Sequence, residues 1–315
     1  MSRSGTAHSL ASNGLVDVSV IIVTYNSAAC VDACLTSIER QQDVRAEIIV
    51  VDNSSADETA RLVHQRGGSV TLLANQENTG FGRGCNQGFA VSHGRFAFFL
   101  NPDAQLEQTD GLVRLCQAMA DNPRWGLAGT RVLSPDGQNE SDPATSYPGQ
   151  RHCRRDFSTL PGKIAWVVGA SMFVRRESFA AVGGFDPAFF LYSEETDLCL
   201  RLRLAGQEIG FVPDVTVRHI GRVSERGQDI YQTRLRVMAG LLRFWVKHYP
   251  AEDVRRLVRR ERLRASFRRE WYGLAARFAG PQSRSWSKCR EYRAVSDATR
   301  EFLRAKASGS VPPGG

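Results

Sequence analysis

Residues 18–26 read Val-Ser-Val-Ile-Ile-Val-Thr-Tyr-Asn, and this segment is the strongest indication of the fold class. It is β-rich and almost continuously apolar until it turns polar at Thr24. Apolar strand patterns recur at residues 48–51, 70–73 and 96–100, and helical patterns separate them at 28–40, 56–66 and 84–92. Such an alternation is typical of a parallel sheet covered on both faces. We therefore predict a doubly wound α/β domain that binds its ligands at the carboxyl ends of the strands.

The remainder of the chain is less regular. Residues 134–163 are rich in Pro, Gly and Ser and predict a long loop over the sheet. Later patterns predict a strand at 166–175, a helix at 194–204, short strands at 209–212 and 215–219, and basic helices from Gln232 to Lys306 with breaks at Pro250 and 280–281. We expect four parts: a disordered leader (1–16), a catalytic domain (17–230), a basic helical region (231–306) and a disordered tail (307–315).

Composition narrows the class of protein. The chain has 315 residues, of which 42% are hydrophobic and 23% charged, and these values exclude collagen-like, low-complexity and wholly disordered proteins. Its longest apolar runs have four or five residues, far below the roughly 18 that a membrane span needs. The first 16 residues lack the apolar segment of a signal peptide, which favours a cytoplasmic protein. The seven cysteines form no CxxC pair, so neither a disulfide framework nor a zinc site is expected.

Charge is distributed unevenly. Residues 231–315 contain 20 Lys and Arg against 7 Asp and Glu, a net charge of +13, whereas the preceding residues contain 21 against 26, a net charge of −5. Basic segments of this kind bind phosphates, either of nucleic acid or of anionic lipid. No nucleic-acid-binding module accompanies the charge, so nucleic acid is not expected as a partner.

The basic region also contains an apolar stripe. Its members follow one another at steps of 4, 4, 3 and 4 residues and are flanked by arginines: Leu263, Phe267, Trp271, Leu274 and Phe278. A helix with an aromatic stripe and basic flanks is typical of a membrane interface. The alternative is that the stripe packs on the catalytic domain and the arginines only solvate it.

The ends of the predicted strands contain polar residues that suit a nucleotide. Asp52, after the second strand, offers a carboxylate to a base N–H or a ribose hydroxyl, although it could also cap the helix expected near residue 56. Residues 78–88 form a Gly-rich stretch whose backbone amides, together with Arg83, suit a phosphate. The chain has neither a GxGxxG turn after its first strand nor a GxxxxGK[ST] motif, which argues against dinucleotide and P-loop sites.

Acidic residues mark two further strand or helix ends. Asp103, in the sequence Asn101-Pro102-Asp103, suits a divalent cation held against a diphosphate, the alternative being a plain turn residue. Three carboxylates lie at the start of the helix predicted at 194–204: Glu194, Glu195 and Asp197. At this position the pKa of a general base can be shifted; the alternative is that the three charges only interact favourably with the helix dipole. His219 ends a strand and is a candidate metal ligand or phosphate donor.

Taken in order, these stretches resemble the family 2 glycosyltransferases of the GT-A fold, and especially their rhamnosyltransferase-like members. The matching segments are residues 18–26, 50–59, 77–89, 98–104, 167–203 and 217–224. They span about residues 17–225, essentially the whole predicted catalytic domain. No single segment is specific for this family, but the six segments together are.

The resemblance implies a nucleotide-sugar donor site. Its nucleotide-binding members would be Thr24, Tyr25, Asn26, Asp52 and Asn53 at the first two strand ends, and Asn78, Gly80 and Arg83 in the loop that closes over the nucleotide. The sugar site would be lined by Trp166, Gly169 and Ala170. The family's DxD-type element reads Asn101-Pro102-Asp103 here, so its first acid is missing. Asp103 and His219 would hold Mg²⁺ or Mn²⁺.

The resemblance also implies the reaction. The family's catalytic base corresponds to Glu195, preceded by Glu194, with Asp197 as the second candidate. The reaction would be an inverting single displacement that moves a sugar to a polyprenol-linked or nascent cell-surface glycan, and we expect the sugar to be L-rhamnose from dTDP-L-rhamnose. The enzyme would lie on the inner face of the plasma membrane, bound through its C-terminal region to anionic lipid.

Two rival interpretations remain. A sugar-phosphate nucleotidyltransferase uses a similar sheet, but it normally has a Gly-rich basic loop after the first strand, where this chain has Thr24-Tyr25-Asn26. A catalytically degenerate homologue could instead serve as a membrane- or partner-binding scaffold. The missing first acid of the DxD-type element and the Glu at position 195 are the features that favour the scaffold.

Overall fold

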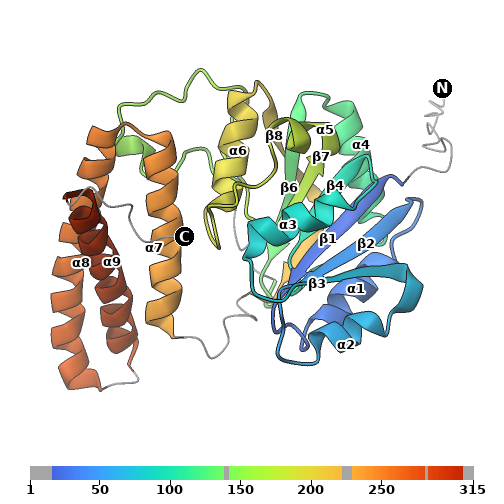
Figure 1. The fold of residues 1–315 in the computed structure, drawn as a ribbon. Coiled ribbons are helices and arrows are strands. Elements are labelled where there is room, and N and C mark those ends of the chain that lie inside the picture. Colours follow the sequence, from blue (N-terminus) through green and yellow to red (C-terminus); the bar gives the residue numbers. More distant parts are fainter. Residues whose placement is uncertain (1–15, 138–141, 222–228, 281–282, 308–315) are drawn as a thin grey trace.

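The computed structural model describes residues 16–137, 142–221, 229–280 and 283–307 (Figure 1). In these residues eight strands form one sheet in the order β3-β2-β1-β4-β7-β6-β8-β5. The strands are β1 (Val18–Thr24), β2 (Ala46–Asp52), β3 (Val70–Ala74), β4 (Phe96–Leu100), β5 (Ala104–Leu106), β6 (Trp125–Leu133), β7 (Ser171–Arg175) and β8 (Glu208–His219). Neighbours pair in parallel except at β7, which is antiparallel to β4 and β6, and at β5, which is antiparallel to β8. The predicted, mostly parallel α/β sheet is confirmed.

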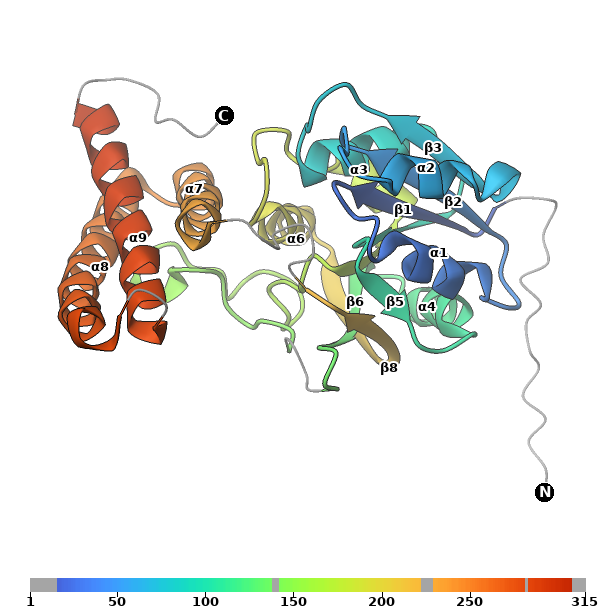
Figure 2. The same cartoon turned by 90° about the horizontal axis from the view of Figure 1, so that it is seen from below.

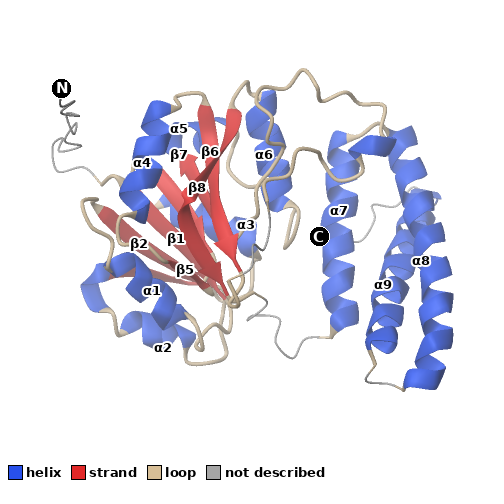
Figure 3. Cartoon of the chain, turned by 180° about the vertical axis from the view of Figure 1, so that it is seen from behind, coloured by secondary structure: helices blue, strands red, loops and turns tan. Residues whose placement is uncertain are grey.

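Helices cover both faces of this sheet (Figure 3). One face packs against α1 (Val31–Glu39), α2 (Thr59–His64) and α4 (Gly111–Asp121). The other packs against α3 (Phe81–Ala90), α5 (Arg176–Ala181) and α6 (Glu194–Leu204). Two short 3₁₀ helices, η1 (Gly67–Ser69) and η2 (Gln150–His152), complete this part. All seven residues of β1 and all five of β4 are buried, as expected for central strands covered on both sides.

The Gly-rich stretch lies mostly within a helix. Helix α3 begins at Phe81 and not near residue 84, so Gly82, Gly84 and Gly88 lie within it, and Gly80 is its N-cap. A Cβ atom at Gly84 would lie 2.9 Å from Val23, and one at Gly88 would lie 2.6 Å from Ile21. These glycines therefore allow α3 to lie close against the central strands, which explains them without a phosphate.

Three other expectations need correction. The strand predicted at 166–175 begins only at Ser171, and Trp166 forms an isolated bridge with Ala144. The two short strands expected near the end of the domain are one strand, β8, which passes residues 213–214 through a shift in its register with β6. The sequence analysis predicts neither the strands β5 and β6 nor the helices α4 and α5.

The C-terminal region is a bundle of three helices beside the sheet (Figures 1 and 3). They are α7 (Ile230–His248), α8 (Ala251–Ala279) and α9 (Arg284–Ala307), with breaks at the predicted positions. This confirms the basic helical extension. None of the described helices combines the length and the apolar character that crossing a membrane requires. The boundary at residues 230–231 stays a prediction, and residues 1–15 and 308–315 of the predicted leader and tail lie outside the described residues.

A third apolar core joins the two parts. Tyr147 and Phe157 lie in the irregular segment that runs from the sheet to the helices (Figures 1 and 2). They pack with Phe244 of α7, and the same core includes Leu257 of α8 and Leu200 of α6. The segment predicted to lie over the sheet therefore packs its aromatic side chains against the C-terminal helices instead.

Candidate active site

The ends of β1 and β2 are fixed by a buried carboxylate. Thr24 donates its hydroxyl to Asp52 Oδ1 at 2.8 Å, and Ser55 donates its backbone N–H to Oδ2 at 2.9 Å and its hydroxyl to Oδ1 at 2.6 Å. Helix α2 begins later, at Thr59, with Glu58 as its N-cap. The alternative that Asp52 caps this helix is therefore wrong, and its carboxylate instead shapes the turn that follows each strand.

Strained backbone conformations occur beside several of the predicted site residues. Five described non-glycine residues have positive φ, and four of them border this site: Asn26 (50°), Ser54 (62°), Tyr192 (73°) and Ser193 (70°). Asn26 follows the half-buried Tyr25 and accepts the backbone N–H of Ala56 at 2.8 Å. Such conformations cost of order 1–3 kcal/mol each and cluster at functional sites.

Asn53 and Asn78 position Gly80. Asn53 donates its side-chain amide to the carbonyl of Gly80 at 3.1 Å, and Asn78 accepts the Gly80 N–H at 3.0 Å. Gly80 has φ 88°, and a Cβ there would lie 2.4 Å from the carbonyl oxygen of Phe190. Arg83 donates Nε–H to the carbonyl of Pro187 at 2.8 Å. The start of α3 is thus fitted against the segment that leads into α6.

The predicted metal ligands lie side by side. His219 Nε2 lies 3.1 Å from Asp103 Oδ1 and 3.3 Å from the amide Nδ2 of Asn101, because β5 pairs with β8 so that Ala104 faces His219. A carboxylate and an imidazole, with an amide beside them, form a donor set that fits Mn²⁺, and the carboxylate and amide oxygens also suit Mg²⁺. Within the described ranges, no three His, Cys, Asp or Glu side chains cluster as metal ligands. A cation here would therefore take its remaining ligands from the diphosphate and water.

Helix α6 begins with two carboxyl groups whose proton affinity is raised. Burial raises the pKa of Glu195 to about 7, although backbone N–H groups and Thr196 partly offset this. Burial, and then the charge of Glu195, raise the pKa of Glu194 well above its usual range. Glu194 Oε2 is buried and has no hydrogen-bond partner among the described residues. A carboxyl group that titrates near neutral pH suits a general base.

Asp197 has a different environment, although it lies only two residues further. It is fully buried, and its oxygens lie 2.7 Å from each of three basic side chains, those of Arg201, Lys247 and His248. Burial alone would raise the pKa of Asp197, but the His248 hydrogen bond and the charges of Arg201 and Lys247 lower it to about 2. This carboxylate is occupied in holding α6 to α7.

Lys247 and His248 were missed by sequence reasoning. They lie at the end of α7, about 50 residues after Asp197, and no motif of the chain connects them with it. The one signal was the helix break at Pro250, which places both residues at a helix end. Lys247 also lies 2.6 Å from Asp186, at the start of the segment that leads into α6.

Gly169 and Ala170 join the metal end of the site to the base. Asn101 donates its N–H to the Ala170 carbonyl at 3.0 Å. A Cβ at Gly169 would lie 3.6 Å from the Cβ of Glu195, so this glycine faces the Glu195 side chain. Trp166 lies further back, donates its indole N–H to Ser146 at 3.2 Å and borders the second and third cores. The structure thus places the predicted residues in groups, one at the ends of β1 and β2 with Gly80, one around Asp103 and His219, and one around Gly169 and Glu195. Trp166 lies at the margin of the last group.

The fold and these residues agree with the comparisons. Residues 19–183 match glycosyl transferase family 2, and residues 109–287 match glycosyl transferase family group 2. The chain belongs to glycosyl transferase family 2. It is a glycosyltransferase with rhamnosyltransferase-like sequence, and the nucleotidyltransferase alternative is not favoured.

Three individual proteins each share less than a third of the aligned residues with this chain. An N-acetylglucosaminyl-diphospho-decaprenol L-rhamnosyltransferase of Mycobacterium tuberculosis is 28% identical over 231 residues, 64% of this chain and 75% of the relative. The low-salt glycan biosynthesis hexosyltransferase Agl10 of Haloferax volcanii is 25% identical over 70% of this chain and 73% of its own. The fold is shared with a Pyrobaculum calidifontis mannosyltransferase solved with GDP-Man and Mn²⁺, at 19% identity and a TM-score of 0.53 over 94% of this chain and 76% of that one.

Proposed function

We propose that this glycosyltransferase inverts the configuration of the sugar it transfers and that Glu195 is its base. The observation that carries this proposal is the position of Glu195, which faces Gly169 at the end of the site that holds Asp103 and has a pKa of about 7. The sugar is L-rhamnose from dTDP-L-rhamnose, and the acceptor is a polyprenol-linked or nascent cell-surface glycan. The name of the relative from Mycobacterium tuberculosis supports L-rhamnose as the sugar and a polyprenol-linked acceptor.

The proposed chemistry is a single displacement. Glu195 accepts the proton of an acceptor hydroxyl as its oxygen attacks the anomeric carbon, and the bond from that carbon to the diphosphate breaks on the opposite side. The electron pair leaves with the nucleoside diphosphate, and no covalent enzyme–sugar intermediate forms. Asp103 and His219 would hold Mg²⁺ or Mn²⁺, which when bound neutralises charge on the departing diphosphate.

The other residues of the site bind the donor or hold the helix that carries the base. The base and ribose of the donor lie at the turns fixed by Thr24 and Asp52, next to Tyr25 and Asn26. The N-terminus of α3, with Gly80 and Arg83, borders the phosphates. Asp197 is a positioning residue rather than a base, because a carboxylate with a pKa of about 2 that is held by Arg201, Lys247 and His248 is a poor proton acceptor.

Attachment to the membrane completes the proposal. The basic C-terminal helices bind an anionic leaflet on the cytoplasmic side, where a polyprenol-linked acceptor is embedded. The scaffold alternative is weaker, because a scaffold has no need for a carboxyl group whose pKa is raised to near neutral beside Gly169.

Calorimetric titration with UDP, dTDP, GDP and CDP, in Mn²⁺ and again in EDTA, tests the donor site. We expect dTDP or UDP to bind, with higher affinity in Mn²⁺. Glu195→Gln should then abolish transfer and leave this binding intact, whereas Glu177→Gln, on an exposed part of α5, should change neither. Absence of binding by every nucleotide would favour the scaffold, and loss of binding in Glu195→Gln would contradict its assignment as base.

A further inference from the structure

Helix α8 carries a broad apolar face that the protein leaves open. Five large side chains of this helix are exposed: Leu263 (73%), Phe267 (73%), Trp271 (65%), Leu274 (56%) and Phe278 (87%). At 3.6 residues per turn their spacing places them on one side of the helix. The interpretation that this stripe packs on the catalytic domain is therefore wrong.

The bundle is held by a different side of α8. Val254, Leu257, Val258 and Ala265 are buried in the third core. The stripe is thus additional to the residues that the fold needs. Contiguous exposed apolar surface of this kind marks an interaction site in a soluble domain.

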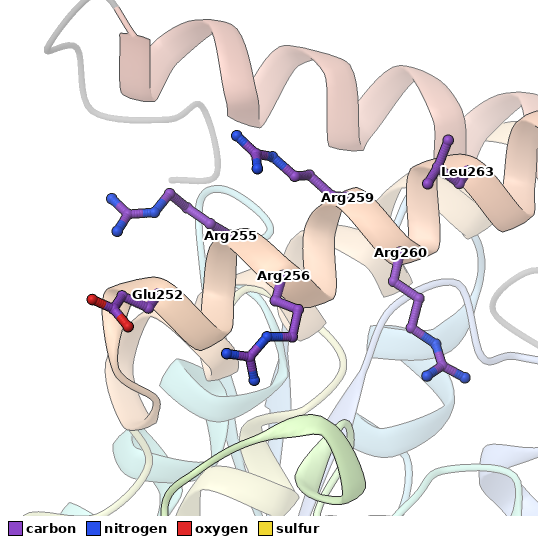
Figure 4. A pocket seen from close by; sticks show the side chains of 6 residues that line it. All are labelled: Glu252, Arg255, Arg256, Arg259, Arg260 and Leu263. Atoms are coloured by element: carbon purple, nitrogen blue, oxygen red, sulfur yellow. The ribbon is translucent and has the colours of Figure 1, made fainter.

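Arginines extend the same surface toward the start of α8. Four arginines, together with Glu252 and Leu263, line a hollow of about 510 Å³ (Figure 4). The arginines are Arg255, Arg256, Arg259 and Arg260. Because Leu263 is also the first residue of the stripe, hollow and stripe are continuous. We call the two together the docking face.

Two of these arginines are available for an external anion. Arg256 lies 3.0 Å from Asp253, and Arg260 lies 3.0 Å from His152. No carboxylate of the described residues lies within ion-pair distance of Arg255 or Arg259, and the two side chains point to the same side of the helix (Figure 4). A guanidinium group without a carboxylate partner is a ready ligand for a phosphate.

We propose that the docking face binds the surface of an anionic membrane. The stripe enters the boundary between headgroups and acyl chains, and the arginine hollow contacts lipid phosphates. Charge selects this partner over a second copy of the chain, because α8 carries nine Arg against four Asp and Glu and two such faces would repel each other. The proposal deepens the membrane attachment proposed above and does not depend on the donor sugar.

Sedimentation of the full-length protein with vesicles tests the proposal. Vesicles of phosphatidylcholine with 30% phosphatidylglycerol should bind it, and vesicles of phosphatidylcholine alone should bind it at least about tenfold less. The triple variant Phe267→Ser/Trp271→Ser/Phe278→Ser and the double variant Arg255→Glu/Arg259→Glu should each weaken binding at least about tenfold.

Control variants make similar substitutions outside the docking face. Arg293→Glu/Arg300→Glu makes the same change of charge on α9, and Val91→Ser removes an exposed apolar side chain at the end of α3. Both should bind the anionic vesicles like the unchanged protein. The fluorescence of the exposed Trp271 should shift to the blue on binding, and this shift should disappear in Trp271→Phe, which still binds.

Three results would overturn the proposal. They are unchanged binding by the stripe variant, equal binding to both kinds of vesicle, and a dimer in sedimentation velocity that the stripe variant abolishes while no vesicle is bound. Nucleotide titration of the same variants keeps the outcomes separate, because a lost docking face leaves donor binding unchanged. Failure of the proposed function would instead remove donor binding from the unchanged protein.

Discussion

His248 Nε2, at the end of α7, lies 2.7 Å from Asp197 Oδ1, in the first turn of α6. Asp197 follows Glu195 by two residues, so this contact ties the helix of the proposed base to the C-terminal bundle. The bundle therefore contributes to the geometry of the active site as well as to the proposed attachment to the membrane.

Replacing His248 tests this coupling. We expect His248→Ala to lower kcat about tenfold with the donor KM nearly unchanged, because α6 loses one of the three partners that hold Asp197 and Glu195 loses its alignment. His248→Gln, which can again donate to Asp197, should restore most of kcat. Steady-state kinetics at saturating acceptor measure both values. A rise in the donor KM with unchanged kcat would show that His248 affects binding instead.

The pKa of Glu195 predicts the pH dependence of transfer. A base must be ionised, so kcat/KM should rise with pH through a midpoint near 7 and level off above it. Initial rates between pH 5.5 and 9, with the concentration of the metal complex held constant, give the profile. A midpoint near 4.5, the ordinary pKa of Glu, would mean that the base is another group or that the site is open to water.

The same shift predicts an effect on stability. Between pH 4.5 and 7 the folded protein retains a proton on Glu195 that the unfolded chain releases, so this group lowers stability as pH rises through that window. Glu195→Gln should therefore melt higher than the unchanged protein at pH 8, by about 2–4 °C for each kcal/mol regained, and equally at pH 4.5. Calorimetric melting curves at the two pH values provide the comparison. A lower Tm at pH 8 would contradict the raised pKa.

The pair formed by Asp103 and His219 predicts where a cation binds. Asp103→Asn should remove most Mn²⁺ binding in the presence of dTDP, and His219→Ala should weaken it less, because the carboxylate supplies the charge. Electron paramagnetic resonance of Mn²⁺ counts the bound ion without an activity assay. His93→Ala, at a side chain that is 75% exposed, serves as the control. Unchanged Mn²⁺ binding in Asp103→Asn would place the metal elsewhere.

Replacing Gly80 should lower both the stability of the protein and its affinity for nucleotide. Gly80 has a positive φ, and the Cβ added in Gly80→Ala would lie 2.4 Å from the carbonyl oxygen of Phe190, so this variant must displace the segment leading into α6 at a cost of about 1–3 kcal/mol. We expect a lower Tm together with weaker nucleotide binding. Gly68→Ala, where no atom lies within 4 Å of the added Cβ, should change neither. A variant at Gly80 that melts and binds normally would show that the loop has another position in solution.

Most of the sheet could be predicted because its central strands are continuous apolar runs. β6 was missed since Gly126 and Gly129 interrupt its pattern, and their reason is tertiary: a Cβ at Gly129 would lie 2.8 Å from Val167. The sequence predicts two strands in place of β8, because residues 213–214 resemble a turn. In the structure the strand continues through them, and its register with β6 shifts at this point. Close packing and bulges depend on partners far away in the chain, so local patterns do not reveal them.

The site was predicted where strand ends carry polar residues and missed where a distant helix completes it. The residue types at positions 103 and 219 suggest a metal, and the fold then places them 3.1 Å apart. The distinction between Glu195 and Asp197 was not available, because it arises from Lys247 and His248, which no local pattern connects to them.

The core that contains Tyr147, Phe244 and Leu200 has a consequence for engineering. Since both parts of the chain contribute to it, the C-terminal helices are not an exchangeable cassette. A truncation before α7 would expose Leu200, less than two helical turns from Glu195, to water. A chimera that borrows the helices of a relative must therefore also borrow the segment around Tyr147 and Phe157, and the matching surface of α6.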